Sequence, residues 1–190
     1  KKKKNITRLM VRPQATPVVR TSVLYSARIP YSVENEIKLD ILASLLRSGY
    51  LQSIREDKGG AYNIKVTSTL AQYPYSQMVL KVAFSTAPEK YKELIPLVDA
   101  GLLKLANNGV DAQELGKIKT YLLKTYKSVV NTNEYWEELL FNYLYNNVDA
   151  DAGYQRFVEQ LTPQDMQRFA KLVVENKKRI EVTMSSEKIQ

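Results

Sequence analysis

The sequence predicts an α+β domain in which helices cover one face of a mainly antiparallel sheet. Stretches rich in β-branched and aromatic residues lie at 18–31, at 61–86 and at 179–185, and helical periodicity dominates between the last two. Strand–helix–strand alternation does not run through the chain, which disfavours a parallel, doubly wound sheet. The predicted order is β-α-β-β-α-α-α-α-β. The length of 190 residues suits a single domain over 18–190, preceded by a basic tail or linker over 1–17.

The first half of the chain predicts a strand, a helix and a hairpin. The strand "VVRTSVLYSARIPY" ends at Pro30, and Ser32 is a suitable N-cap for the helix that follows. Ile37, Ile41 and Leu45 then recur at helical spacing, which gives this helix one apolar face. After two glycines, "AYNIKVTSTL" and "SQMVLKVAFST" alternate as strands on either side of the loop "AQYPYS".

The second half predicts four helices and a final strand. Thr86 and Glu89 form a capping-box pattern at the start of a helix that runs to "NNG". The next helix spans 111–146 and is interrupted by "NTN" near its middle, and a short helix follows around 151–160. The last helix begins at "TP", where proline is favoured in the first turn, and "RIEVTMS" closes the chain as a strand.

Composition excludes several classes of function. The net charge is +8, but four of these charges belong to Lys1–Lys4, and no later lysine-rich block recurs, so binding of nucleic acid is not expected. No apolar run is long enough for a membrane span. Cysteine and histidine are both absent, which removes disulfides, thiol nucleophiles, His-based triads and His- or Cys-ligated zinc. We therefore expect no metal site and no catalytic group of its own in this chain.

Arg55 and Tyr62 are the candidate site residues. They flank the turn "EDKGG" in the stretch "LQSIREDKGGAYNIKVTS". One interpretation is a charged, solvated end of a helix followed by a strand tyrosine. The other is that the turn brings the guanidinium beside the phenol, where both donate hydrogen bonds to a carbonyl or an oxyanion. Neither group is a nucleophile or a good base at neutral pH, so the pair would assist a reaction rather than perform it.

Other polar and aromatic residues suggest weaker hypotheses. Neighbouring positions on a helix point apart, so two adjacent glutamates are expected on a solvated face rather than as a catalytic pair. A cluster of four aromatic residues in the helix after "NTN" is expected in the core or at an interface, and two tyrosines at the hairpin tip suit contact with a partner. These residues are Glu137 and Glu138, then Tyr135, Trp136, Tyr143 and Tyr145, and finally Tyr73 and Tyr75.

The stretch "SGYLQSIREDKGGAYNIKVTS" resembles the C-terminal, non-catalytic domain of the insulinase/pitrilysin family of zinc metallopeptidases, the inverzincins. Members share a segment of the form leucine…arginine-glutamate…glycine-x-alanine/glycine-tyrosine, and "VAFSTAPEKYKELIPLVDAGLLKLANNGVDAQELGKIKTYLL" resembles the family's next strand, helix, turn and helix. The resemblance covers nearly the whole chain. It implies related α+β domains paired into two halves that close on a peptide.

The resemblance also implies roles for the site residues. In the family, the arginine and tyrosine that match Arg55 and Tyr62 reach across a closed chamber to the bound peptide. The zinc site, H-x-x-E-H on a helix, belongs to another domain. The matching helix here, residues 34–51, has no histidine. No cofactor is therefore expected in this chain, and zinc is expected in the catalytic domain of the parent enzyme.

The sequence thus predicts a non-catalytic, substrate-binding domain of a zinc-dependent endopeptidase. Its partners would be a peptide substrate and a zinc-bearing domain or subunit of the same family. The alternative is a structural or partner-binding relative with no role in proteolysis. The sequence leaves the location open, with the bacterial periplasm or cell envelope as a guess.

Overall fold

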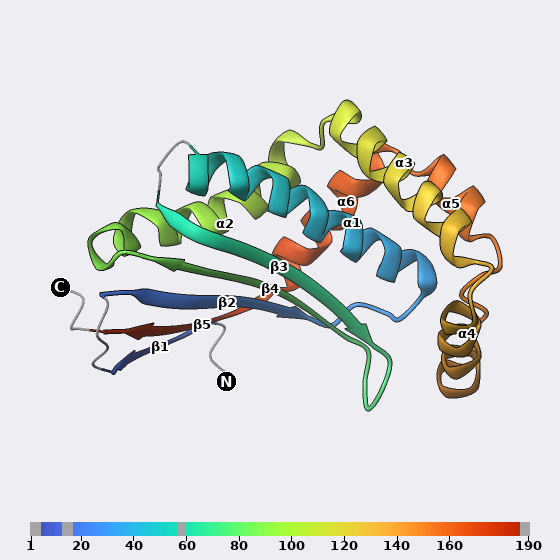
Figure 1. Cartoon of the computed structure of the whole chain (residues 1–190), viewed down its shortest axis with the longest axis horizontal. Helices are drawn as coiled ribbons and strands as arrows, with labels where there is room; N and C mark the ends of the chain where they lie inside the picture. Colours follow the sequence, from blue (N-terminus) through green and yellow to red (C-terminus); the bar gives the residue numbers. More distant parts are fainter. Residues whose placement is uncertain (1–4, 13–16, 57–59, 187–190) are drawn as a thin grey trace.

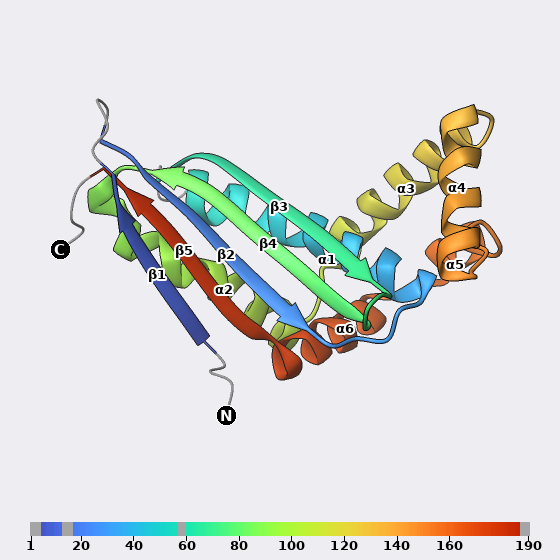
Figure 2. The ribbon, with the colours of Figure 1, turned by 90° about the horizontal axis from the view of Figure 1, so that it is seen from below.

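The computed structural model describes residues 5–12, 17–56 and 60–186. Within these residues, five strands form one sheet in the order β1-β5-β2-β4-β3, which is seen face-on in Figure 2. Three of the neighbouring pairs are antiparallel and the pair β1–β5 is parallel, so the sheet is mainly antiparallel, as predicted. The strands are β1 (Asn5–Val11), β2 (Val19–Ala27), β3 (Ala61–Ala71), β4 (Gln77–Thr86) and β5 (Lys178–Ser185).

The helices α1, α2 and α6 cover one face of this sheet, whereas α3, α4 and α5 extend beyond its end (Figure 1). This arrangement confirms the predicted α+β class, with helices packed on one face. A π-helical segment, η1, follows α1, and a short 3₁₀ turn, η2, precedes α2. The elements are α1 (Val33–Tyr50), η1 (Leu51–Glu56), η2 (Pro88–Lys90), α2 (Tyr91–Asn108), α3 (Ala112–Val129), α4 (Asn133–Asn146), α5 (Tyr154–Gln160) and α6 (Pro163–Asn176).

The break predicted at "NTN" is confirmed, and it separates α3 from α4, which the predicted order had counted as one helix. The chain turns at residues 130–132, and the Thr132 hydroxyl then accepts a hydrogen bond from the Tyr135 backbone N–H at 3.3 Å, which caps α4. The described residues therefore contain five helices between the hairpin and the last strand, not four. The N-cap expected at Ser32 is confirmed, because its hydroxyl accepts from the Asn35 N–H at 3.1 Å.

The edge strand β1 corrects the prediction of a tail or linker over residues 1–17. Asn5–Val11 pairs with β5 in parallel, from Asn5 opposite Arg179 to Val11 opposite Ser185. All seven residues of β1 are exposed. The partner strand is more than 160 residues away in sequence, so no local pattern could indicate the pairing.

The core lies between the sheet and its helices. Burial alternates along β2, where Val23 and Tyr25 are fully buried and Leu24 between them is half-buried. Ile41 and Leu42 of α1 and Leu102 of α2 meet them in one hydrophobic cluster. The helical stripe and the strand alternation predicted from the sequence thus face each other across this interface.

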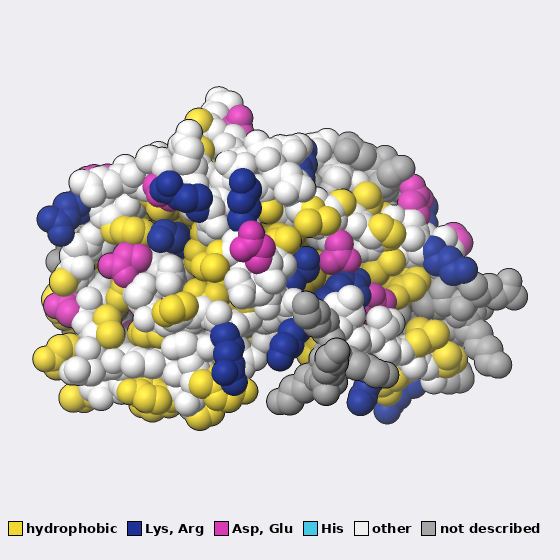
Figure 3. Space-filling model, turned by 180° about the vertical axis from the view of Figure 1, so that it is seen from behind, with side chains coloured by type: hydrophobic (Ala, Val, Ile, Leu, Met, Phe, Trp, Pro, Cys, Tyr) yellow, Lys and Arg dark blue, Asp and Glu magenta, His cyan; other side chains and the backbone are white. Residues whose placement is uncertain are grey.

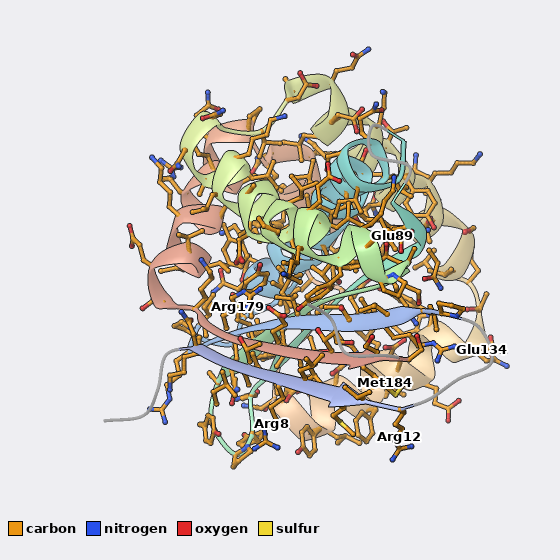
Figure 4. All side chains as sticks on the ribbon, turned by 90° about the vertical axis from the view of Figure 1, so that its left-hand side faces the viewer. Arg8, Arg12, Glu89, Glu134, Arg179 and Met184 are labelled. Carbon is orange, nitrogen blue, oxygen red and sulfur yellow. The ribbon has the colours of Figure 1, made fainter. Side chains whose placement is uncertain are left out.

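A cluster of charged and hydroxyl groups lies on the helix side of the sheet beneath α2. The Arg179 guanidinium contacts Asp99 of α2 at 2.9 Å and Glu181 at 2.8 Å. Tyr25 donates to Asp99 at 2.7 Å, and Tyr91 donates to Glu181. Figure 4 shows Arg179 between the sheet and α2, with Arg8 on the opposite side of the sheet. Glu181 is buried, so its charge depends on Arg179.

Gly101 lets α2 approach the end of α1. A Cβ atom at Gly101 would lie 2.3 Å from Cε1 of the Tyr50 ring. The Tyr50 ring is buried, and its hydroxyl donates to the Val98 carbonyl at 2.6 Å. Burial and this hydrogen bond both oppose a shift of the ring. We expect Gly101→Ala to lower the free energy of unfolding by about 1–3 kcal/mol through overpacking, despite the better helix propensity of alanine. Urea unfolding measures this difference.

Gly116, inside α3, is the matched control for this glycine substitution. Nothing lies within 4 Å of a Cβ atom built there. Gly116→Ala should therefore stabilise the fold by about 0.5–1 kcal/mol, the usual gain of alanine over glycine in a helix. Equal effects of the two substitutions would show that the contact between Gly101 and Tyr50 does not restrict the packing of α1 and α2.

Candidate functional site

Arg55 lies on an irregular turn at the end of α1. The regular helix ends at Tyr50, and Leu51–Glu56 continues as a π-helical segment. Ile54 is fully buried and anchors this segment to the core. π-helical turns are rare and occur often at functional sites, because they change the direction of the side chains that follow.

Gly60 closes the loop after Arg55. Its N–H donates to the Ile54 carbonyl at 3.1 Å, and its carbonyl accepts from the Thr86 hydroxyl. A Cβ atom at Gly60 would lie 2.6 Å from Cδ1 of Leu94, a fully buried side chain of α2. A larger residue at this position would therefore force the Leu94 side chain to move. The two hydrogen bonds join Gly60 to Ile54 in η1 and to Thr86 at the end of β4.

The Thr86 hydroxyl does not cap the next helix, contrary to the sequence-based expectation. The 3₁₀ turn η2 follows Ala87 at its N-cap, without a side-chain capping bond. Thr86 is fully buried at the end of β4, and its hydroxyl bonds Gly60 instead. The Thr86 hydroxyl therefore stabilises the position of Gly60, next to the candidate site, instead of the start of the helix.

Tyr62 lies at a β-bulge near the start of β3. Ala61 pairs with Thr86 and Asn63 pairs with the adjacent Ser85, so Tyr62 is the extra residue in β3. A bulge of this kind twists the strand and changes the direction of a side chain, and bulges are enriched next to active sites. Both candidate residues therefore lie where the backbone leaves regular geometry.

The side chains of Arg55 and Tyr62 lie outside the described part of the structure, as do residues 57–59. The side-by-side arrangement of guanidinium and phenol remains a prediction. The described backbone places the two positions on either side of one loop whose ends are joined at Ile54 and Gly60.

The side chains of this chain do not suit a zinc ion. The sequence has neither histidine nor cysteine, the ligands that zinc prefers. Among the residues that the structure describes, no three carboxylates gather closely enough to hold a metal ion.

The aromatic side chains of α4 are more exposed than the sequence suggested. Trp136, Tyr143 and Tyr145 are exposed, so they do not belong to the core. Tyr73 at the hairpin tip packs edge-on against Tyr145, with ring centroids 5.4 Å apart. Figure 3 shows hydrophobic side chains reaching the surface at the end of the molecule formed by α4.

A cavity between α1, α3 and α4 was not predicted from the sequence. Glu138 is exposed, as expected, but it also lines this cavity together with Glu36 and Asp40. The helical spacing of Glu36 and Asp40 placed them on one face of α1. Nothing in the sequence indicated that Glu138, about a hundred residues later, would face them.

Comparison with known proteins identifies the class to which this fold belongs. Residues 1–122, nearly two thirds of the chain, match the model of the Peptidase M16 inactive domain. The chain therefore belongs to the Peptidase M16 inactive domain family. This confirms the predicted membership of the insulinase/pitrilysin group and the assignment to its non-catalytic domain.

Individual relatives agree with this family. The chain is 30% identical over 110 residues to "Probable zinc protease PqqL" of Escherichia coli (strain K12), an alignment that covers 56% of this chain and 12% of that protein. The crystal structure of the periplasmic protease PqqL from Escherichia coli superposes with a TM-score of 0.84 at 19% identity, and the match covers 95% of this chain and 20% of that one. The chain thus spans a small part of these relatives.

Two further structures share the fold. A peptidase M16 inactive domain from Pseudomonas fluorescens superposes with a TM-score of 0.72 at 17% identity, covering 96% of this chain and 43% of that one. A protease from Helicobacter pylori superposes with a TM-score of 0.75 at 22% identity, covering 96% and 45%. Separately, none of the helices in the described residues has the length and apolarity needed to cross a bilayer.

Proposed function

We propose that this chain is a substrate-binding domain that encloses and positions a peptide opposite the zinc site of another domain. The observation that supports this most is its membership of the Peptidase M16 inactive domain family. The name of the Escherichia coli relative describes a zinc protease, and the chain matches only 12% of that protein, which supports a catalytic region outside the matched part. The peptide would be held by this chain and cleaved by that region.

Arg55 and Tyr62 are the residues proposed to contact the peptide. Each lies at an irregular point of the backbone, one in η1 and one at the bulge of β3, and one hydrogen-bonded loop separates them. Arginine and tyrosine both donate hydrogen bonds, and at neutral pH arginine stays charged and the tyrosine hydroxyl stays protonated. Both can therefore donate to a carbonyl of the peptide backbone. Such donors act most strongly when a second domain excludes water from the site.

Peptide affinity tests this proposal. The zinc-bearing domain of the parent enzyme is inactivated by replacing the glutamate of its H-x-x-E-H segment with glutamine, so that peptide is bound but not cleaved. We expect the dissociation constant for a fluorescent peptide to fall at least about tenfold when this chain is added, a gain of about 1.4 kcal/mol. An unchanged dissociation constant, with the two domains still associated, would favour the structural or partner-binding alternative.

A further inference from the structure

A cavity of about 270 Å³ lies between α1, α3 and α4, at the end of α1 opposite to Arg55. Aliphatic side chains from the three helices form much of its wall, and the side chains of Tyr126, Tyr135 and Tyr154 complete it. The volume lies below the range of about 300–1,000 Å³ that is usual for sites of whole small-molecule ligands. It suits one side chain of a larger partner better.

The three tyrosine rings are held in a fixed arrangement. The ring of Tyr126 stacks on Tyr154, with centroids 5.1 Å apart, and meets the ring of Tyr135 edge-on at 6.0 Å. The hydroxyls of Tyr126 and Tyr135 both donate to Oδ1 of Asp151, at 2.8 and 2.5 Å. The polar ends of the two rings are therefore already satisfied by one carboxylate, and the rings contribute aromatic surface to the cavity.

Three carboxylates line the same cavity, and no lysine or arginine does. Glu36 and Asp40 lie one turn apart on α1, and Glu138 comes from α4. Desolvation, followed by the charge of Asp40, raises the pKa of Glu36, although a hydrogen bond from Tyr31 at 3.5 Å opposes the rise. Within the described residues, none of the three carboxylates forms an ion pair with a basic side chain.

We propose that this cavity binds the cationic side chain of a lysine or arginine that belongs to a partner polypeptide. The aliphatic wall would contact the methylene stem, while the charged head would reach the carboxylates. Aromatic faces attract cations as well, most strongly where water is partly excluded. Asp40 and Glu138 are exposed at the surface, which leaves the mouth open to such a side chain. This inference does not depend on the function proposed for Arg55 and Tyr62.

The test is a titration of the chain with N-acetyl-lysine methylamide, followed by backbone amide chemical shifts. Its neutral counterpart is N-acetyl-norleucine methylamide, which has a similar stem without the charge. We expect the lysine compound to shift the amides around Glu36 and Glu138 saturably, with a dissociation constant on the order of 1–10 mM. Absence of a saturable shift, or equal binding of the norleucine compound, would overturn the proposal.

Two adjacent glutamates of α4 provide matched variants. Glu138 lines the cavity, whereas the neighbouring Glu137 does not. We expect Glu138→Gln to weaken binding of the lysine compound about five- to tenfold, because a charge-assisted contact is lost. Glu137→Gln should leave the affinity within about twofold, since solvent screens a charge outside the cavity. An equal loss of affinity in the two variants would show that the lysine compound responds only to the overall charge of α4. That result would contradict a specific site at the cavity.

Discussion

Replacing Tyr62 with phenylalanine is expected to lower kcat/KM for peptide cleavage by about 10²–10³ when this chain is combined with the zinc-bearing domain of its parent enzyme. The substitution removes one hydroxyl donor and keeps the ring, so packing at the start of β3 should change little. If the phenol supports charge that develops on the scissile carbonyl, its loss raises the barrier for cleavage. Steady-state kinetics with a fluorogenic peptide measure the effect.

A second variant at Arg55 and a control variant at Tyr73 accompany this measurement. Arg55→Ala should lower kcat/KM to a similar extent, because a guanidinium that holds the substrate backbone is removed. Tyr73 lies exposed at the hairpin tip, so Tyr73→Phe is the control and should leave the rate unchanged. Rates within about twofold of the wild type for both Tyr62→Phe and Arg55→Ala would mean that this loop does not contact the reacting peptide.

Replacing Arg179 with methionine is expected to lower the free energy of unfolding by about 3–5 kcal/mol. Burial lowers the pKa of Arg179, but the hydrogen bond that its guanidinium donates to Glu181 and the charges of Asp99 and Glu181 outweigh burial, so the pKa is raised overall and the guanidinium stays charged. Without it, Glu181 remains buried with only the Tyr91 hydroxyl and loses its opposite charge. Urea unfolding with a constant slope would measure the loss.

Arg168 is the control for this ion pair. It contacts Asp165 at 2.6 Å, but its side chain is 76% exposed, so Arg168→Met should cost no more than about 1 kcal/mol. The double variant Arg179→Met/Glu181→Gln should recover part of the stability, since the buried charge is removed with its partner. A loss below about 1 kcal/mol for Arg179→Met alone would show that solvent screens this cluster.

Most of the fold was predictable because its signals are local. The apolar stripe of α1, the alternation in β3 and β4 and the turn between α3 and α4 all arise within a few residues of one another. The strand β1 was not predictable in this way. Its residues follow four lysines, precede Pro13 and pair with a strand at the other end of the chain.

The polar interactions were also predictable only where both partners lie close together in the sequence. The Ser32 cap is local and was predicted correctly, whereas the Thr86 hydroxyl bonds Gly60, a residue 26 positions earlier. Which of two available partners a hydroxyl chooses depends on the packing of the whole sheet against α2. The clustering of Asp99 and Arg179 likewise depends on segments 80 residues apart.

The candidate site combined both kinds of information. The turn that they flank singled out Arg55 and Tyr62, resemblance to a peptidase family gave them a role, and the family is confirmed. The π-helical turn at Arg55 and the bulge at Tyr62 have no simple signature in the sequence, because both are single-residue departures from regular hydrogen bonding. The acidic, tyrosine-lined cavity was not foreseen, since it joins residues from α1, α3, α4 and the start of α5.

We propose that this chain takes part in peptide cleavage without performing the chemistry itself. The most direct measurement is the rate of peptide hydrolysis by the zinc-bearing domain of the parent enzyme, assayed alone and with this chain. We predict no hydrolysis by this chain alone, and a rate increase of at least about 10²-fold when it is added to the zinc-bearing domain. Full activity of the zinc-bearing domain without this chain, or hydrolysis by this chain alone, would contradict the account.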